Sequence, residues 1–312
     1  MSRAGIFVVA GGALLVAVGL TLAQVGEEPG ALPNWQALVL GIVQGATELL
    51  PISSSGHLIL VPWLFEWEYL EQNDEFNQTF DVALHVGTLV AVVSYFWADV
   101  KRLIAAWIGS VRRRRIETPD ERVAWFVAVA TVPAALVGAL GESFIAEHLG
   151  EPWQIAIFLA VFGVLLWFAD RTPARRSMSD LGLGTAVAVG FAQSLALMPG
   201  VSRSGITITA ARFLGLDRDS AARFSFLLLI PIVFGASLWE GINEVLLGDL
   251  PAGSTGPFLV GMIASAAIGL LAIWALLGYV RRHDYTIFVV YRLAVAAFIL
   301  LLIAANIREP TF

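Results

Sequence analysis

Apolar and charged positions divide this chain into long uncharged segments separated by short charged ones. Five stretches contain no Asp, Glu, Lys or Arg; they lie between residues 3 and 27, 122 and 142, 151 and 170, 180 and 203, and 249 and 281. A helix needs about 20 predominantly apolar residues to cross the hydrocarbon core of a bilayer. Four of these stretches and three further apolar segments predict membrane-crossing helices near residues 5–25, 79–99, 122–142, 152–170, 220–240, 256–279 and 286–307. The stretch between residues 180 and 203 belongs to a different kind of segment, described below.

The charged positions between these helices separate by sign. Basic residues gather at residues 3, 101–122, 171–176, 212–223 and 281–282, and acidic residues gather at 27–28, 66–75, 142–151 and 240–249. The excess of Lys and Arg in cytoplasmic loops places the basic set inside the cell. Segment 35–65 lies between two acidic clusters, so it must enter and leave the membrane on the outer face. Segment 181–211 lies between two basic clusters, so it must enter and leave on the inner face.

Each of these two segments is interrupted by a cluster of Pro, Gly and Ser residues, at 51–56 and at 199–205. Such breaks are typical of re-entrant helical hairpins, whose backbone turns within the membrane where protein surrounds it. The hairpins also resemble each other: Gly41, Gln44 and Ser53 recur as Gly190, Gln193 and Ser202, always 149 residues later.

Because one hairpin enters from outside and the other from inside, the chain predicts an inverted-topology repeat. That plan brings two broken helices together near the bilayer midplane. The fold class is thus an all-α polytopic membrane protein with two re-entrant hairpins. We expect residues 1–30 to form an extra transmembrane helix or an uncleaved signal anchor. Residues 31–312 then form one polytopic domain, with repeat 1 at about 35–142, repeat 2 at about 152–279 and a last helix at about 286–307.

Composition agrees with a membrane protein. Of the 312 residues, 58% are apolar and 14% are charged, whereas soluble domains carry roughly 25% charged residues. Mean hydropathy is +0.78. There is no cysteine, which excludes disulfides and thiolate-bound metals. The basic run at 112–115 is interpreted as a cytoplasmic anchor loop and not as a nucleic-acid site. The oligomeric state stays open, a homodimer included.

The two hairpins carry polar side chains within the membrane, where such groups are costly and indicate function. Gln44 and Glu48 are four residues apart, so they share a helix face, and their oxygens suit a hard divalent cation. Ser54 and His57 lie within one helical turn, as a nucleophile and its base would. Arg203 offers a planar set of donors for phosphate oxygens.

The two predicted helix starts form a candidate anion site. Ser53 and Ser202 occupy the N-cap positions after each break, and backbone N–H groups at a helix start favour a phosphate. The residues expected to surround the phosphate are Ser53, Ser55, Gly56, Ser202, Ser204 and Gly205.

Three further polar residues have weaker interpretations. Asp81 and His85 are four apart, and the pair is either functional or an interfacial carboxylate beside a buried hydrogen bond. For Arg292, we expect a side chain that extends to the cytoplasmic face.

These motifs together resemble the bacitracin-resistance type of undecaprenyl-diphosphate phosphatase. That family has an (E/Q)-x-x-x-E motif followed by P-x-S-S-[ST]-G-H, and residues 44–57 read QGATELLPISSSGH. It also has P-G-x-S-R-S-G, and residues 199–205 read PGVSRSG. Residues 80–88 (FDVALHVGT) and Tyr291-Arg292 are similar as well, so the resemblance spans about residues 35–307.

The resemblance implies hydrolysis of undecaprenyl diphosphate to the monophosphate in the bacterial plasma (inner) membrane. It implies dependence on Mg²⁺ or Ca²⁺, recycling of the lipid carrier for cell-wall synthesis, and bacitracin resistance. Carried onto this sequence, Gln44 and Glu48 form the acidic-motif pair, Ser54 and His57 the catalytic pair, and Arg203 the phosphate clamp. Many members have Glu where this chain has Gln44, which removes one negative charge from the expected metal site.

Two questions stay open from the sequence. Either Ser54 or His57 could attack phosphorus. An inverted repeat with broken helices is also a transporter plan, so the alternative function is a transporter or flippase for the same polyprenyl phosphate lipid. Against transport alone, a Ser and a His beside Arg203 are more reactive than binding requires.

Overall fold

A computed structural model describes residues 31–67, 69–70, 73–240 and 253–311 of the chain. The expected N-terminal helix at 5–25 lies outside these residues. The described part is helical, and an isolated bridge between Arg176 and Leu216 is its one extended pairing. Its α-helices are α2 (Asn34–Leu49), α3 (Ser54–Phe65), α5 (Asp74–Tyr95), α6 (Trp97–Arg113), α7 (Pro119–His148), α8 (Pro152–Asp170), α9 (Leu183–Ser194), α10 (Arg203–Phe213), α11 (Arg218–Glu240), α12 (Thr255–Val280) and α13 (Thr286–Ala304).

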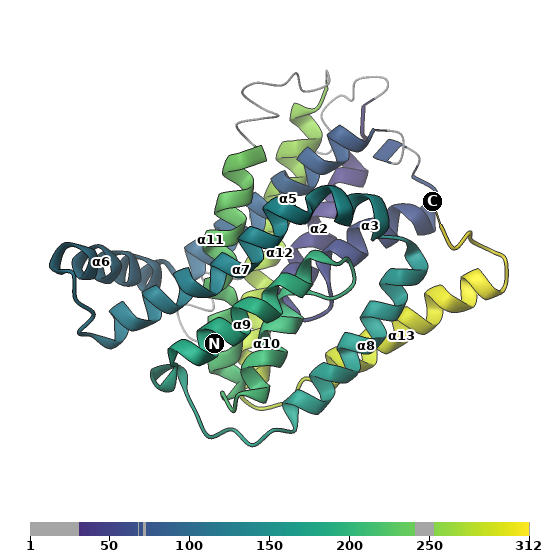
Figure 1. Cartoon of the computed structure of the whole chain (residues 1–312). Coiled ribbons are helices and arrows are strands. Elements are labelled where there is room, and N and C mark those ends of the chain that lie inside the picture. The colour runs from purple at the N-terminus through teal and green to yellow at the C-terminus, as the bar shows by residue number, and fades with distance from the viewer. Residues whose placement is uncertain (1–30, 68, 71–72, 241–252, 312) are drawn as a thin grey trace.

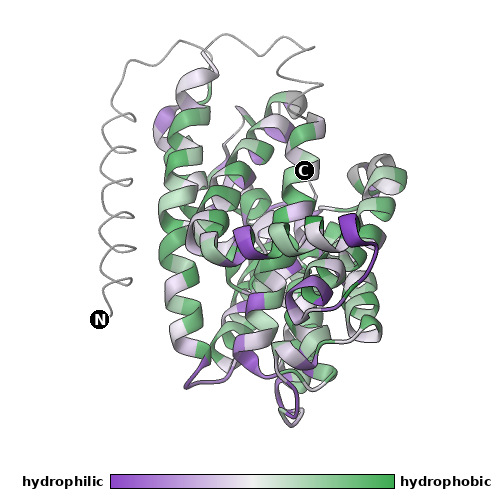
Figure 2. Cartoon of the chain, turned by 90° about the vertical axis from the view of Figure 1, so that its left-hand side faces the viewer, coloured by the Kyte–Doolittle hydropathy of each residue, from purple (hydrophilic) through white to green (hydrophobic). Residues whose placement is uncertain are grey.

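Six helices of the described chain, α5, α7, α8, α11, α12 and α13, are long and apolar enough to cross a membrane. They correspond to the six crossings expected after residue 30. In Figure 2, hydrophobic colour runs along most of the helical ribbon, and hydrophilic colour gathers in loops and at helix ends. The chain is therefore a multi-pass integral membrane protein, as the hydropathy pattern predicts.

Local signals explain where several of these helices begin. The Thr118 side chain accepts from the backbone N–H of Glu121, and Pro119 occupies the first turn of α7. The Glu121 carboxylate in turn accepts from the N–H of Thr118 at 3.2 Å, which completes a capping box. Pro152 plays the same first-turn role in α8.

Small residues let the central helices approach closely. Gly45 of α2 faces α12, where an added Cβ would lie 2.5 Å from the carbonyl oxygen of Ser265. The Ser265 hydroxyl donates to the carbonyl of Leu84 in α5 at 2.7 Å. Contacts between small residues are the usual basis of helix association in lipid. They hold α2, α5 and α12 together in the middle of Figure 1, while α8 and α13 pack side by side at the lower right.

One element differs from the sequence expectation. The basic segment 101–122 was predicted to be a loop, but most of it belongs to α6, which follows α5 after a break at Phe96. The prediction missed this helix because it is not apolar enough to register as a crossing. Its hydrophobic residues lie on one face, and α6 projects from the side of the bundle in Figure 1.

Two helix pairs contain the breaks that the sequence predicts. The chain leaves α-helical geometry between α2 and α3 at residues 50–53. Between α9 and α10 it does so at residues 195–202, which begin with a 3-10 turn at Leu195–Leu197. Neither α3 nor α9 is long enough to cross a membrane.

Candidate active site

The two breaks have nearly the same backbone at the start of the following helix. Ser53 and Ser202 both have φ of 77°, with ψ of 98° and 117°. This left-handed region is unfavourable for residues other than Gly. Each serine side chain accepts a hydrogen bond from the N–H of a glycine three residues on, Gly56 or Gly205. Both serines are therefore N-caps, as predicted, in a strained conformation of the kind that accompanies functional sites.

Contacts across the breaks bring the two helix starts together. The N–H of Gly200 donates to the Ser53 hydroxyl at 3.1 Å, and the Ser204 hydroxyl donates to the carbonyl of Leu50 at 2.9 Å. Side chains on Gly56 would be crowded here: an added Cβ would lie 3.3 Å from the backbone of Gly200. The glycine thus allows the close approach of two segments that are about 150 residues apart in sequence.

Glu48 is the centre of the polar cluster at this junction. One carboxylate oxygen accepts from Arg203 twice, from Nε at 3.1 Å and from Nη2 at 2.9 Å. The other oxygen accepts a very short hydrogen bond from the Ser54 hydroxyl. Glu48 and Arg203 are both largely buried. The side chains singled out in the two motifs thus meet around one carboxylate.

Arg203 is held from a third helix. Its Nη1 donates to the carbonyl of Ser225 in α11 at 3.0 Å. Because Glu48 and Ser225 engage all three guanidinium nitrogens, the group is fixed in one orientation. A fixed donor set of this kind can stabilise charge on phosphoryl oxygens at no reorganisation cost.

The structure does not pair His57 with Ser54, as the one-turn spacing suggested. His57 Nδ1 lies 2.6 Å from the carbonyl oxygen of Ser53, and Nε2 lies 2.8 Å from the hydroxyl of Tyr291 in α13. A carbonyl can only accept, so Nδ1 donates, and in neutral His57 the Nε2 atom accepts from Tyr291. The group positioned to receive the Ser54 proton is therefore Glu48. From the sequence, Tyr291 had no expected role beyond the Tyr291-Arg292 pair that resembles the family.

His85 comes closer to the site than the sequence indicated. Its Nε2 lies 3.5 Å from the carboxylate of Glu48, and its Nδ1 is 2.7 Å from the carbonyl oxygen of Asp81. His85 thus touches the polar cluster, and its Nδ1 also makes the hydrogen bond that the second interpretation expected. A function for the pair with Asp81 stays a prediction. The i,i+4 spacing with Asp81 gave no sign of Glu48, which lies on a different helix.

Gln44 and Glu48 fit a divalent cation only in part. The amide nitrogen of Gln44 donates to Glu48 at 3.4 Å, and the buried amide oxygen of Gln44 has no hydrogen-bond partner. That oxygen is one open ligand. The carboxylate, however, already accepts from Arg203 and Ser54. Within the described residues, no three His, Asp or Glu side chains are grouped to hold a metal ion. A cation here would need substrate phosphate oxygens for much of its coordination, which is how Mg²⁺ is commonly bound.

The repeat-related Gln193 has a different environment. Its amide nitrogen donates to the carbonyl of Ala130 in α7 at 3.4 Å, away from the Glu48 cluster. Its amide oxygen is buried without a hydrogen-bond partner, like that of Gln44, but no carboxylate lies four residues on. Only the first hairpin contributes a carboxylate to the site.

The sequence interpretation of Arg292 was wrong. This side chain is fully buried and does not extend to the cytoplasmic face. It donates to five carbonyls, those of Pro51, Phe158, Leu159, Gly200 and Val201. Because buried carbonyls need donors, Arg292 crosslinks both breaks to α8. A charged residue in an apolar helix usually extends its side chain to the membrane surface. Arg292 does not need to, because the backbone carbonyls beside the site accept its hydrogen bonds.

Comparison with known proteins identifies the family. The sequence profile described as "Bacitracin resistance protein BacA" matches residues 37–298. The chain belongs to this family. The chain is 47% identical over 279 residues to the undecaprenyl-diphosphatase of Thermomicrobium roseum, an alignment that covers 86% of this chain and 98% of the relative. It is 49% identical over 259 residues to the undecaprenyl-diphosphatase of Geobacter sulfurreducens, covering 82% and 93% of the two chains.

The BacA match includes every candidate site residue, from Gln44 to Arg292. A third relative, the undecaprenyl-diphosphatase of Desulforudis audaxviator, is 47% identical over 83% of this chain and 93% of its own length. The resemblance noted from two short motifs therefore holds over most of the sequence.

Proposed function

We propose that this chain hydrolyses undecaprenyl diphosphate to undecaprenyl phosphate and inorganic phosphate. The observation that carries the proposal is the contact of Glu48 with both Ser54 and Arg203 at the junction of two helix starts. A hydroxyl beside a base, a fixed guanidinium and two helix N-termini are what phosphoryl transfer needs. The names of the relatives support the same activity. The product would be reused as the lipid carrier of cell-wall synthesis, which would also confer bacitracin resistance.

In the proposed first step, the Ser54 oxygen attacks the terminal phosphorus while its proton passes to Glu48. The bond between that phosphorus and the bridging oxygen breaks, and undecaprenyl phosphate leaves with the bonding electrons. Arg203 neutralises the charge that develops on the phosphoryl oxygens. The short hydrogen bond from Ser54 to Glu48 supports this assignment of the base.

In the second step, water attacks the phosphoserine and releases inorganic phosphate. Glu48 returns its proton to the Ser54 oxygen, and His57 is the expected base for the water, whose proton it then releases to the departing phosphate or to solvent. His57 can serve once its Nε2 exchanges Tyr291 for water. The rival scheme has His57 attack phosphorus directly, with Ser54 as a phosphate ligand. The contact of Ser54 with the Glu48 carboxylate, which His57 lacks, favours the serine scheme.

We further propose that Mg²⁺ or Ca²⁺ assists the reaction. Gln44 and Glu48 would hold the ion together with substrate phosphates, and when bound it would supply positive charge to the diphosphate. The unpartnered amide oxygen of Gln44 is the feature of this chain that supports the idea. Ser55 and Ser204, which hydrogen-bond to the cap serines, could reorient their hydroxyls toward the phosphate.

We infer that α2–α3 and α9–α10 are re-entrant hairpins of an inverted-topology repeat that meet near the bilayer midplane. The matching φ angles of Ser53 and Ser202 support the repeat. We infer that this membrane is the bacterial inner membrane, as the family resemblance implies. The charge pattern supports a catalytic hairpin that enters from outside. The same plan would suit a flippase for this lipid.

Phosphate release by the purified chain separates hydrolysis from transport. We expect inorganic phosphate from undecaprenyl diphosphate in detergent, where no second compartment exists, and a loss of activity in EDTA that Mg²⁺ or Ca²⁺ restores. Ser54→Ala should be inactive and folded. Binding of the lipid without phosphate release by the wild type would favour the transporter. Mass photometry of the same sample would report whether the chain forms a homodimer.

A covalent intermediate distinguishes the two nucleophiles. Phosphoserine survives an acid quench, whereas phosphohistidine does not. We expect acid-stable label on Ser54 after rapid mixing with substrate labelled at the terminal phosphate. Label on His57, or substantial turnover by Ser54→Ala, would contradict the serine scheme.

A further inference from the structure

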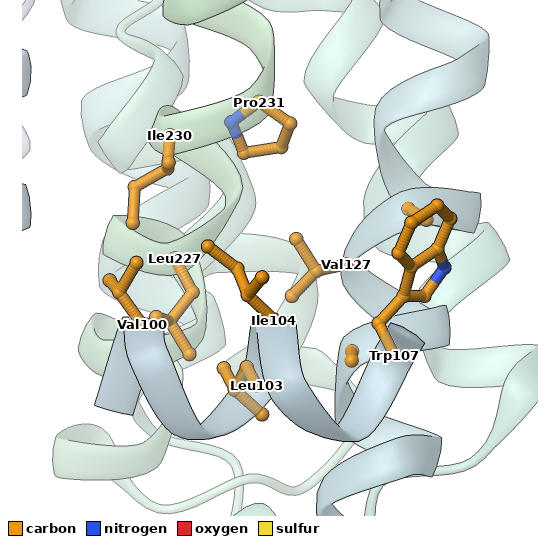
Figure 3. Close-up of a pocket in the computed structure, with 10 residues that line it drawn as sticks. Val100, Leu103, Ile104, Trp107, Val127, Leu227, Ile230 and Pro231 are labelled. Carbon is orange, nitrogen blue, oxygen red and sulfur yellow. The ribbon is translucent and has the colours of Figure 1, made fainter. Parts of the chain in front are cut away.

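An apolar pocket lies away from the polar site, between α6, α7 and α11. Its volume is about 260 Å³, and its lining contains no charged side chain. Figure 3 shows Val100, Ile104 and Trp107 of α6 on one side, with Leu227, Ile230 and Pro231 of α11 opposite and Val127 of α7 between them. Neither hairpin contributes to the lining, so the pocket is separate from the candidate active site.

The pocket opens outward along α6. Ile104 and Trp107 line it, yet they are 54% and 41% exposed. The α6 residues of the lining, Val100, Leu103, Ile104 and Trp107, follow the spacing of one helix face. Trp97 and Ile108 are exposed apolar residues that continue this face beyond the pocket. A continuous apolar surface thus runs from the cavity to the outside of the protein.

Basic residues border this surface. Lys101 and Arg112 are eleven residues apart, about three helical turns, so they lie on the same side of α6. At 100° per residue they fall next to Trp97 and Ile108, on the edge farther from the pocket. Lys101 lies over the Trp97 ring at 5.2 Å. Both residues are exposed, and neither forms an ion pair within the described residues.

We propose that α6 and this pocket bind an anionic glycerophospholipid of the surrounding bilayer. Part of one acyl chain occupies the pocket, and the anionic headgroup contacts Lys101 beside Trp97. Arg112 lies about 16 Å farther along α6 and adds positive charge to the same surface. Charge complementarity selects this occupant. The cavity is purely apolar, and beside it on this amphipathic helix lie two cations that have no ion-pair partner among the described residues. This combination matches a ligand with an apolar tail and an anionic head. The charge pattern places α6 at the cytoplasmic surface, where anionic lipids attract basic segments.

Lipid binding by the purified full-length chain tests the proposal. Native mass spectrometry of delipidated protein would be titrated with dioleoyl phosphatidylglycerol and with dioleoyl phosphatidylcholine, which has the same chains. We expect the anionic lipid to bind at least ten-fold more tightly. The double variant Lys101→Gln/Arg112→Gln should lose this preference, since each charge contributes on the order of five-fold. The matched control Arg175→Gln/Arg282→Gln removes two exposed cations outside α6 and should keep the preference.

Filling the pocket tests the place of the acyl chain. Ala128→Leu should weaken binding of both lipids, whereas Ala135→Leu, on an exposed part of α7, should not. Ala124→Leu fills the same cavity and replaces Ala128→Leu if that variant does not fold. Equal affinity for the two lipids, or equal loss in the Arg175/Arg282 control, would overturn the proposal. So would a filled pocket that binds lipid normally but raises KM for the polyprenyl diphosphate, because that result places the substrate tail there.

Discussion

At the scale of single residues, Glu48 organises the candidate site. Its two oxygens receive donors from both motifs, Ser54 from the first and Arg203 from the second. A buried carboxylate is stable only when it is paired and hydrogen-bonded. The same contacts that stabilise Glu48 therefore hold the proposed nucleophile, Ser54, and the proposed phosphate clamp, Arg203, in place.

Arg203→Lys should lower turnover by about 10²-fold or more, by analogy with the loss of one oxyanion donor. Lysine keeps the charge but cannot contact Glu48 and Ser225 with a planar group. The measurement is kcat for phosphate release, with the thermal unfolding midpoint as the control for folding. Activity within a factor of about two of wild type would contradict the clamp role.

Gln44→Glu should make the enzyme more dependent on divalent cation. The substitution removes the donor that now points at Glu48 and places a second carboxylate beside the first. A hard cation between the two would relieve their repulsion. We expect less activity without metal and a lower Mg²⁺ concentration for half-maximal rate, measured by metal titration. A folded protein that is inactive at every Mg²⁺ concentration would show that neutrality at this position matters and that the metal assignment is wrong.

Tyr291→Phe tests the position of His57. The variant removes the hydroxyl 2.8 Å from Nε2 and leaves the ring, which stacks near His57. A neutral hydrogen bond contributes about 1 kcal/mol, so a fall in kcat of roughly five-fold is expected. Tyr279→Phe, a remote tyrosine of α12, serves as the control. An unchanged pH–rate profile and kcat would mean that Tyr291 does not hold the histidine during turnover.

At the scale of elements, α13 fixes the two helix breaks against α8. Arg292 spans the gap because its guanidinium reaches carbonyls of both breaks and of α8. A loop within the membrane is tolerated where protein satisfies its backbone. The last helix of the bundle is thus what makes two irregular segments stable beside each other.

Arg292→Leu should destabilise the protein strongly. Several buried carbonyls would lose their donors, and each unsatisfied group costs about 1–3 kcal/mol. We expect a lower thermal unfolding midpoint in detergent and reduced activity together. Arg282→Leu, at an exposed position, is the matched control and should leave stability almost unchanged. Normal stability with lost activity would instead give Arg292 a direct part in the chemistry.

At the scale of the whole molecule, the charge pattern predicts on which side of the membrane each hairpin begins and ends. If α2–α3 is re-entrant, both of its ends face outward, whereas both ends of α9–α10 face inward. The chain has no cysteine, so single cysteines report their own location without a background. This permits a direct test of the inverted repeat.

An impermeant maleimide should label Ala31→Cys and Glu66→Cys in intact cells. Arg175→Cys and Asp217→Cys should react only after the cells are permeabilised. The two positions of each pair flank one hairpin. Both should react from the same side, because a re-entrant segment returns to the face from which it entered. Labelling of one member of a pair from each side would show a full crossing and rule out the re-entrant hairpin.

Much of this protein could be predicted from its sequence because the membrane restricts the choices. Uncharged segments of sufficient length specify crossings, and α8 at Pro152–Asp170 lies where it was expected. The breaks at Pro51 and Pro199 followed from residues that interrupt helices. Local chemistry also determined the caps, since Ser53 and Ser202 accept the expected backbone N–H groups.

Only the tertiary structure decided which polar groups touch. Ser54 and His57 are neighbours in sequence, but the site pairs Ser54 with Glu48 and His57 with Tyr291, 234 residues away. The acceptors of Arg292 are likewise distant carbonyls with no sequence signature. Spacing along one helix determines which side chains share a face, whereas hydrogen-bond partners depend on how separate helices approach. The sequence therefore determined the membrane-crossing helices, the breaks and the family, and the packing of α2, α3, α10 and α13 decided the partners.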